Sequence, residues 1–271
     1  MAGDDYLVTL GMEFNPFLKN SREIIIPNAE YNEAMVRLDY LSKTKGFGLL
    51  TGAPGRGKTT IIRKWVEKLN PSLYKVVYSS LSTLTVQEFY RSIASGLGAE
   101  PSFRKIDNFN IIQEEITRLT IEKKRTPVII IDEANYIKSA ILNDLKMLFN
   151  FEMDSKDRAI ILLAGLPQLN NTLNLASNEP LRQRIVMNYN VDGLTKEEGR
   201  TYISTKLKSS GNCQVTFDDA AIEALLNAAD GTPRMINKYC SSCLLIAGSK
   251  QLPFISADMV MQAVNECELV S

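Results

Sequence analysis

One eight-residue stretch constrains the fold of this chain more than any other. Residues 52–59 read Gly-Ala-Pro-Gly-Arg-Gly-Lys-Thr, between an apolar run that ends at Leu50 and a helix-like segment that begins at Thr60. This is the spacing G-x-x-x-x-G-K-T in a strand–loop–helix context. The glycines allow backbone N–H groups to surround a phosphate chain, and the start of the helix adds a partial positive charge. The stretch therefore predicts a nucleotide-binding loop.

The same spacing assigns a role to each polar side chain of the loop. Lys58 can reach the β and γ phosphates of ATP, and the Thr59 hydroxyl can ligate Mg²⁺. The residues expected to hold the nucleotide are Gly52, Ala53, Pro54, Gly55, Arg56, Gly57, Lys58, Thr59 and Thr60.

A second motif, at residues 128–134, reads Val-Ile-Ile-Ile-Asp-Glu-Ala. Four apolar residues followed by two acids are typical of a buried strand that ends at a catalytic edge. Asp132 would hold Mg²⁺ through water, and Glu133 would orient and polarise the attacking water. Lys58 together with Glu133 favours hydrolysis over phosphoryl transfer to a small molecule.

Composition excludes several other chemistries. The chain of 271 residues has no histidine, which removes histidine bases, histidine triads and most zinc sites. Cys240 and Cys243 have metal-ligand spacing, but no second pair completes a zinc site, and free cysteines in an apolar helical run behave as small hydrophobes. The 31 basic and 31 acidic side chains balance, so any contact with nucleic acid must come from a local patch.

Apolar strands alternate with helical patterns as far as residue 193, which predicts a parallel sheet covered on both faces. From Leu194 onward only helices are predicted, and Thr195 and Glu198 form a capping-box start. We expect an N-terminal arm at residues 1–30, a nucleotide-binding domain at 31–193 and a helical lid at 194–271. The arm, with a possible strand at residues 23–26, either packs on the core, covers the adenine base, or does both.

Five ordered motifs resemble AAA+ ATPases, and within them the ExeA-type and TniB/TnsC/MuB-type ATPases. Besides the two motifs above, they are Gly165-Leu-Pro-Gln-Leu169, Leu181-Arg-Gln-Arg-Ile185 and Gly231-Thr-Pro-Arg234, and Phe14-x-Pro-Phe17 is also similar. The resemblance covers essentially the whole chain. It implies an α/β P-loop fold, a three-layer αβα core with a parallel sheet, followed by a small all-helical lid.

The resemblance also implies roles for three arginines. Arg184 or Arg182 would be an arginine finger inserted into the site of the next subunit, unless both pair with local acids on a solvated face. Arg234 would reach the γ-phosphate from the lid, unless it simply faces water. Leu166 falls near a position that is usually polar, so either Gln168 or an earlier polar group substitutes, or hydrolysis is slow, which suits a switch better than a motor.

Three client classes follow from the resemblance: a transposition regulator, an ExeA-like secretion ATPase, and a replication initiator or clamp-loader relative. Secretion ATPases of this kind carry a membrane helix after the lid and initiators carry a winged helix, and neither pattern is present here. We therefore expect a cytoplasmic bacterial regulator of transposition, without membrane contact. Its expected partners are double-stranded DNA, a DDE-type transposase, a target-selector protein and copies of itself, in a hexameric ring or a filament.

Loops at one face of the sheet offer candidate DNA contacts, because basic and hydroxyl side chains there can meet phosphates without reading sequence. They are Ser80, Thr83, Arg104 and Lys105. The alternative for Arg104 and Lys105 is an ordinary solvated charge pair.

Overall fold

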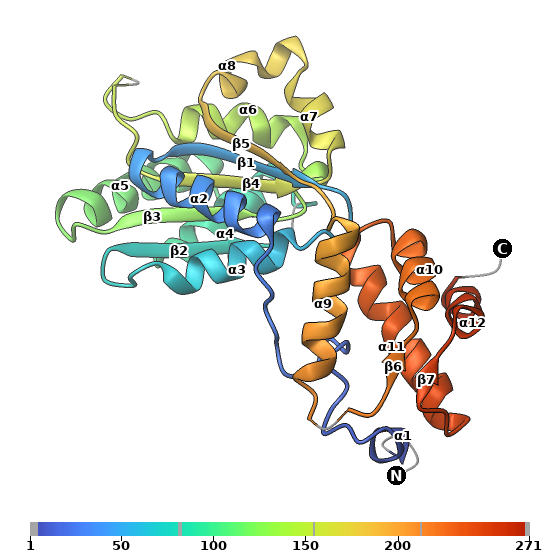
Figure 1. The fold of residues 1–271 in the computed structure, drawn as a ribbon. Coiled ribbons are helices and arrows are strands. Elements are labelled where there is room, and N and C mark those ends of the chain that lie inside the picture. The colour runs from blue at the N-terminus through green and yellow to red at the C-terminus, as the bar shows by residue number, and fades with distance from the viewer. Residues whose placement is uncertain (1–4, 81–82, 154, 212, 269–271) are drawn as a thin grey trace. The chain divides into compact units, whose positions relative to one another are not determined.

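The computed structural model describes residues 5–80, 83–153, 155–211 and 213–268. The chain divides into two compact units, which we describe separately (Figure 1). The α/β unit comprises residues 31–54 and 58–191. The helical unit comprises residues up to 30, residues 55–57 and residues from 192 onward.

The α/β unit is built on one sheet of five parallel strands in the order β2-β3-β4-β1-β5. The central strand β1 pairs with two strands that follow much later in the chain, Gly46 with Ile160 and Phe47 with Ile185. The predicted parallel sheet is confirmed. Its strands are β1 (Gly46–Gly52), β2 (Tyr74–Ser79), β3 (Thr126–Ile131), β4 (Ile160–Gly165) and β5 (Ile185–Val191).

Helices cover both faces of this sheet, as the apolar strands require. Val128 and Ile130 of β3 pack on the side of α2 and α3, whereas Ile129 and Ile131 pack on the side of α4, α5 and α6. The predicted three-layer core is therefore confirmed (Figure 1). The helices of this unit are α2 (Ala29–Thr44), α3 (Lys58–Lys68), α4 (Val86–Leu97), α5 (Lys105–Ile121), α6 (Ser139–Leu148), α7 (Gln168–Leu173) and α8 (Glu179–Arg182), with 3-10 turns η1 (Ala134–Tyr136) and η2 (Ala176–Asn178).

Gly48 in β1 allows α2 to lie directly against the sheet. A Cβ atom at this position would lie 2.4 Å from Cδ2 of Leu41, which is fully buried. Real Cβ contacts are not this short, so the Leu41 side chain or α2 itself would have to shift if residue 48 carried a side chain.

In the described part of the helical unit, five helices pack around an apolar core of their own. They are α1 (Asp5–Thr9), α9 (Lys196–Lys208), α10 (Asp219–Ala229), α11 (Pro233–Ser249) and α12 (Ala257–Cys267). The predicted capping box is present, since the Thr195 hydroxyl accepts the N–H of Glu198 and the Glu198 carboxylate accepts the N–H of Thr195. A two-stranded parallel ribbon was not expected: β6 (Thr216–Phe217) pairs with β7 (Phe254–Ile255).

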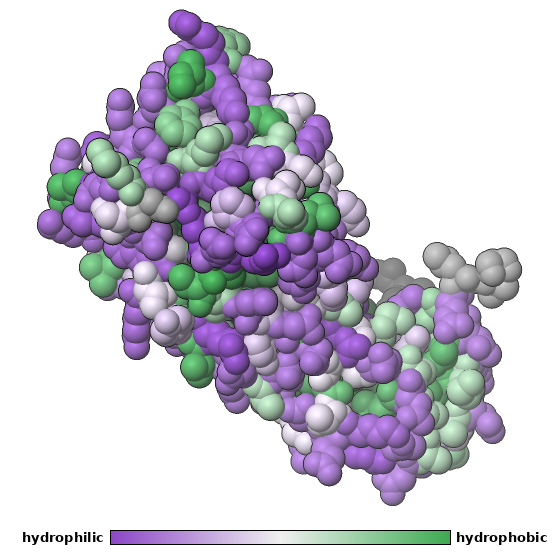
Figure 2. Space-filling view, turned by 90° about the horizontal axis from the view of Figure 1, so that it is seen from above, coloured by the Kyte–Doolittle hydropathy of each residue, from purple (hydrophilic) through white to green (hydrophobic). Residues whose placement is uncertain are grey.

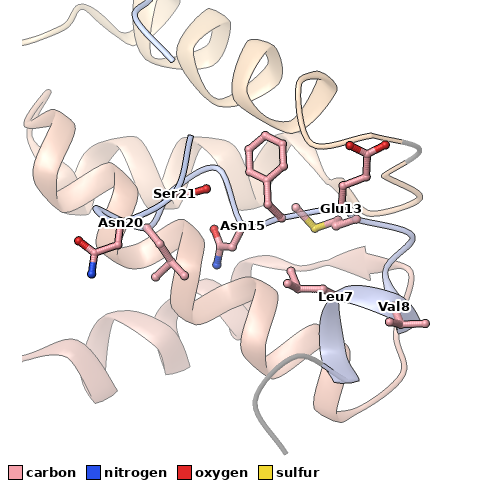
Figure 3. A pocket seen from close by; sticks show the side chains of 9 residues that line it. Leu7, Val8, Glu13, Asn15, Asn20 and Ser21 are labelled. Carbon is pink, nitrogen blue, oxygen red and sulfur yellow. The ribbon is translucent and has the colours of Figure 1, made fainter. Parts of the chain in front are cut away.

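The N-terminal arm belongs to the helical unit. Its Asn15 is buried and donates hydrogen bonds to Tyr6 Oη at 3.2 Å and Ser241 Oγ at 3.0 Å. Residues of the arm between Leu7 and Ser21 line an open pocket (Figure 3).

The strand predicted at residues 23–26 is wrong, because these residues pair with no strand. Pro27 lacks an N–H and restricts the conformation of the residue before it.

On the face seen in Figure 2, hydrophobic residues are scattered among hydrophilic ones. Within the described part of the chain, no helix combines the length and the apolar character that crossing a membrane requires. Cys240 and Cys243 lie fully buried in α11, where burial raises the pKa of both thiols.

Candidate active site

The predicted nucleotide loop connects β1 to α3, as the motif requires. Gly55 and Gly57 have φ angles of 77° and 97°, a left-handed conformation that glycine adopts without strain. The Lys58 side chain is buried, and its Nζ donates to the carbonyl oxygens of Gly52 at 2.7 Å and Ala53 at 3.1 Å. The ammonium group is thus held inside its own loop.

The loop and the second motif meet through one hydrogen bond. Thr59 Oγ1 donates to Asp132 Oδ2 at 2.9 Å, and Asp132 is only 3% exposed. Because the hydroxyl gives its proton to Asp132, its lone pairs remain available to a metal ion. Hydroxyl and carboxylate oxygens are the hard ligands that Mg²⁺ prefers, so this pair fits the predicted magnesium site.

Glu133 follows directly and is exposed. Its backbone lies in the left-handed region, with φ 53° and ψ 36°, and its N–H donates to Asp132 Oδ1 at 2.9 Å. A non-glycine residue in this region costs about 1–3 kcal/mol, and such strain concentrates at functional sites. The strained turn ends the run of β3 and presents the carboxylate outward.

A polar residue that sequence reasoning missed adjoins this pair. Tyr78, in β2, donates its hydroxyl to Asp132 Oδ2 at 2.9 Å. Burial, reinforced by Asp132 itself, raises the pKa of Tyr78 to about 12. The alternation of β2 could have pointed to this side chain, because residues 74, 76 and 78 share the face on which α3 packs.

Near Leu166 the polar groups come from other positions. The N–H of Leu166 donates to Asn135 Oδ1 at 3.1 Å. Thr51, fully buried at the end of β1, donates to Asn190 Oδ1 at 3.1 Å and accepts from Asn170 Nδ2 at 3.5 Å. Gln168 is exposed in the first turn of α7. The carboxyl ends of β1 and β5 are therefore joined by a polar contact that no sequence motif predicted.

The two arginines expected to act as a finger differ in environment. Arg184 is half-buried, and its Nη1 donates to the carbonyl oxygen of Lys146 in α6 at 2.5 Å. Arg182, at the end of α8, is exposed and makes only long contacts with Asn174, at 3.3 Å to the carbonyl oxygen and 3.5 Å to Oδ1.

Two further predicted site residues have their contacts within the helical unit. Arg234 is exposed in the first turn of α11, and its N–H donates to the carbonyl oxygen of Gly55 at 3.4 Å. Arg56 forms an ion pair with Asp230 at 3.1 Å. A Cβ on Gly55 would lie 2.8 Å from Cβ of Arg234. Glycine at residue 55 therefore leaves room for Arg234 and also permits the left-handed backbone conformation.

The candidate DNA contacts are not equivalent. Ser80 and Thr83 are exposed, whereas Leu81 and Ser82 between them lie outside the described residues. The Arg104 side chain is 81% exposed and lies 3.4 Å from Asp107.

Lys105 is the most constrained of these candidates. It pairs at 2.6 Å with Asp144, whose side chain is 8% exposed. Its Nζ also lies 5.5 Å from the centre of the Tyr90 ring.

Comparison with known proteins agrees with this geometry. Residues 41–173, which contain the loop, β3 and the strained Glu133, match a family model described as an AAA domain. Cdc6p from Pyrobaculum aerophilum superposes with a TM-score of 0.72 at 16% identity, over 94% of this chain and 72% of that one. The α/β unit has the AAA+ fold. Drosophila ORC bound to DNA also superposes with a TM-score of 0.72, at 14% identity, over 99% of this chain and 67% of that chain.

A curated protein is also similar to most of this chain in sequence. General secretion pathway protein A of Aeromonas hydrophila is 27% identical over 248 residues. The alignment covers 89% of this chain but 45% of that protein, so the chain spans about half the length of its relative.

Proposed function

We propose that this AAA+ chain is an ATP hydrolase that converts ATP and water to ADP and phosphate. The observation that supports it best is the 2.9 Å hydrogen bond from Thr59 to Asp132, which brings the phosphate loop and the acidic strand end together. Neither motif alone is specific, but a loop lysine followed by a hydroxyl that contacts a strand-end acid supplies the parts of a P-loop ATPase.

Each residue then has a distinct task. Lys58 and the loop backbone bind the phosphates, Thr59 and Asp132 hold Mg²⁺, and Glu133 orients and polarises the attacking water. Bound Mg²⁺ would supply charge neutralisation at the β and γ phosphates. Thr51, Asn170 and Asn190 are polar groups near the neighbouring strand ends. Residue 166 itself carries an apolar side chain, in keeping with slow, switch-like hydrolysis.

We further propose that the active site is completed in a homo-oligomer, by Arg182 of a neighbouring copy. On entering a neighbouring site, the exposed guanidinium of Arg182 would lose hydrogen bonds that are long, 3.3 Å or more. Arg184 would instead lose a 2.5 Å hydrogen bond to the backbone of α6. Arg234 would contact the γ-phosphate and report the nucleotide state.

The proposed client is double-stranded DNA. The likeness to ORC bound to DNA motivates this choice, and the exposed Arg104 offers a phosphate contact. Because contacts sum along a duplex, an assembly can bind DNA although each copy has no net charge. Regulation of a DDE-type transposase is a narrower hypothesis, and the comparisons support an initiator-like role at least as well.

A secretion ATPase is the second candidate, favoured by the 27% identity to General secretion pathway protein A. In that case the ATP site would have the same residues, but duplex DNA would have no effect on assembly or hydrolysis.

Electron microscopy of the protein with duplex DNA separates these functions. Rings or filaments on DNA with a non-hydrolysable ATP analogue, but not with ADP, would support the DNA-dependent switch. Assembly that is the same with and without duplex DNA would support the secretion-type candidate. In a separate phosphate-release assay with ATP and Mg²⁺, absence of hydrolysis both with and without duplex DNA would contradict the enzyme assignment itself.

A further inference from the structure

Tyr78 and Thr59 donate hydrogen bonds to the same oxygen of Asp132. Both donor–acceptor distances, from Tyr78 Oη and from Thr59 Oγ1 to Asp132 Oδ2, are 2.9 Å. The other carboxylate oxygen accepts the N–H of Glu133 at 2.9 Å. Three donors from β2, α3 and the turn after β3 thus fix the rotation of one buried carboxylate.

The position of Tyr78 in the sheet makes this contact possible. β2 pairs with β3 so that Tyr78 lies beside Ile130, close to the end of the strand that carries Asp132. Its neighbour Val77 points to the opposite core, on the side of α4 and α5, so Tyr78 faces the side where α3 begins. The side chain spans the site from the edge strand, and 51% of the residue remains exposed.

A phenol suits this place because it donates a hydrogen bond without adding charge. A lysine or arginine there would neutralise Asp132 and compete with the metal ion that Asp132 is proposed to hold.

We propose that Tyr78 is a positioning residue for the magnesium site, which acts by orienting the Asp132 carboxylate toward the metal-bound water. This inference rests on the proposed ATPase function. It assigns part of the Mg²⁺ affinity to an edge-strand residue that belongs to neither sequence motif.

The test is a Mg²⁺ titration of the binding of a fluorescent ATP analogue to the full chain. In Tyr78→Phe we expect the Mg²⁺ concentration for half-maximal binding to rise about 3- to 10-fold. Outer-shell partners of metal ligands are usually worth about 10- to 100-fold, and the effect should be smaller here because Asp132 itself acts through water. Nucleotide affinity measured in EDTA should not change.

Two controls separate positioning from general structure. Tyr40→Phe removes a hydroxyl from a tyrosine of α2 that is 53% exposed, and it should titrate as wild type. In an Asp132→Asn background, Tyr78→Phe should cause little further change, because the two residues act through one contact.

Equal Mg²⁺ titrations of Tyr78→Phe and wild type would overturn the inference, as would an equal loss of nucleotide affinity with and without Mg²⁺. Wild-type binding that is itself independent of Mg²⁺ would instead contradict the proposed function.

Discussion

Arg184 donates a 2.5 Å hydrogen bond to the carbonyl oxygen of Lys146, whereas Arg182, two residues earlier, is exposed. We therefore expect Arg182→Ala to slow ATP hydrolysis by up to about 10³-fold, the lower range for a finger supplied in trans, without loss of stability. Arg184→Ala should instead lower the free energy of unfolding by about 1.5–3 kcal/mol, the usual value of a hydrogen bond that involves a charged group. Phosphate release and urea denaturation measure the two effects.

Mixing inactive variants provides the control for this assignment. A site with intact Glu133 next to a copy with intact Arg182 is complete, so equal amounts of Arg182→Ala and Glu133→Gln protein should recover hydrolysis. No recovery on mixing, with oligomers present, would show that Arg182 does not act in trans.

Glu133→Gln should abolish hydrolysis while leaving ATP binding intact. The amide cannot polarise water, and loss of a general base typically costs about 10²–10⁴-fold. The measurement is phosphate release beside binding of a fluorescent ATP analogue. Wild-type turnover in this variant would mean that another group activates the water.

Arg104→Ala should weaken DNA binding equally for all sequences. Because one phosphate contact is lost, the slope of log affinity against log salt should become shallower by about 1. Lys105→Ala should leave the slope unchanged and destabilise the fold by about 1–3 kcal/mol, because it leaves the buried Asp144 without its ion-pair partner. Salt titrations of duplex binding distinguish these outcomes, and an unchanged slope for Arg104→Ala would remove it from the DNA contacts.

The stability of the helical unit should depend on Lys206. Its Nζ donates to the carbonyl oxygen of Pro16 at 2.9 Å and to Asn237 Oδ1 at 3.1 Å, and burial lowers its pKa to about 8. The unfolded chain then binds more protons than the folded one between about pH 8 and the ordinary lysine pKa near 10.5. The contribution of Lys206 to the free energy of unfolding should therefore rise with pH across this window and stay flat below it.

Denaturation of wild type and Lys206→Met from pH 7 to 10.5 checks this sign. As the pH rises, the free energy of unfolding of wild type should increase relative to that of Lys206→Met. Lys208→Met, at an exposed position of the same helix, is the matched control. A difference that is constant with pH would show that Lys206 titrates normally.

Gly48→Ala should destabilise the α/β unit by about 1–3 kcal/mol, the usual cost of overpacking. The added methyl would meet Leu41 Cδ2, so the same substitution should cost less in a Leu41→Ala background. Chemical denaturation of the two single variants and the double variant measures this coupling. If the losses in the free energy of unfolding of the two single variants simply add in the double variant, the added methyl is not strained against Leu41.

The sequence predicts best the elements whose structure depends on residues close together in the chain. The loop at 52–59 and the apolar strand that ends at Ile131 lie where expected because glycine spacing and continuous apolar character are local. The alternation of β2 indicates the face on which Tyr78 lies, but not its hydrogen bond to Asp132, because that contact depends on which strands become neighbours. The pairing of Lys105 with Asp144 was hidden for the same reason, since α5 and α6 are separated by β3 in the chain.

The strand order has a consequence for synthesis on the ribosome. β1 leads into the phosphate loop, yet its two neighbours begin at Ile160 and Ile185. A nascent chain that has emerged only as far as β3 has the loop and Asp132, but both edges of β1 still lack their strands. Pairings so distant in sequence form slowly and leave strand edges open to aggregation. Nucleotide binding should therefore appear late during translation, after β5 has left the exit tunnel, and ribosome-bound chains stalled before residue 185 should not retain ATP.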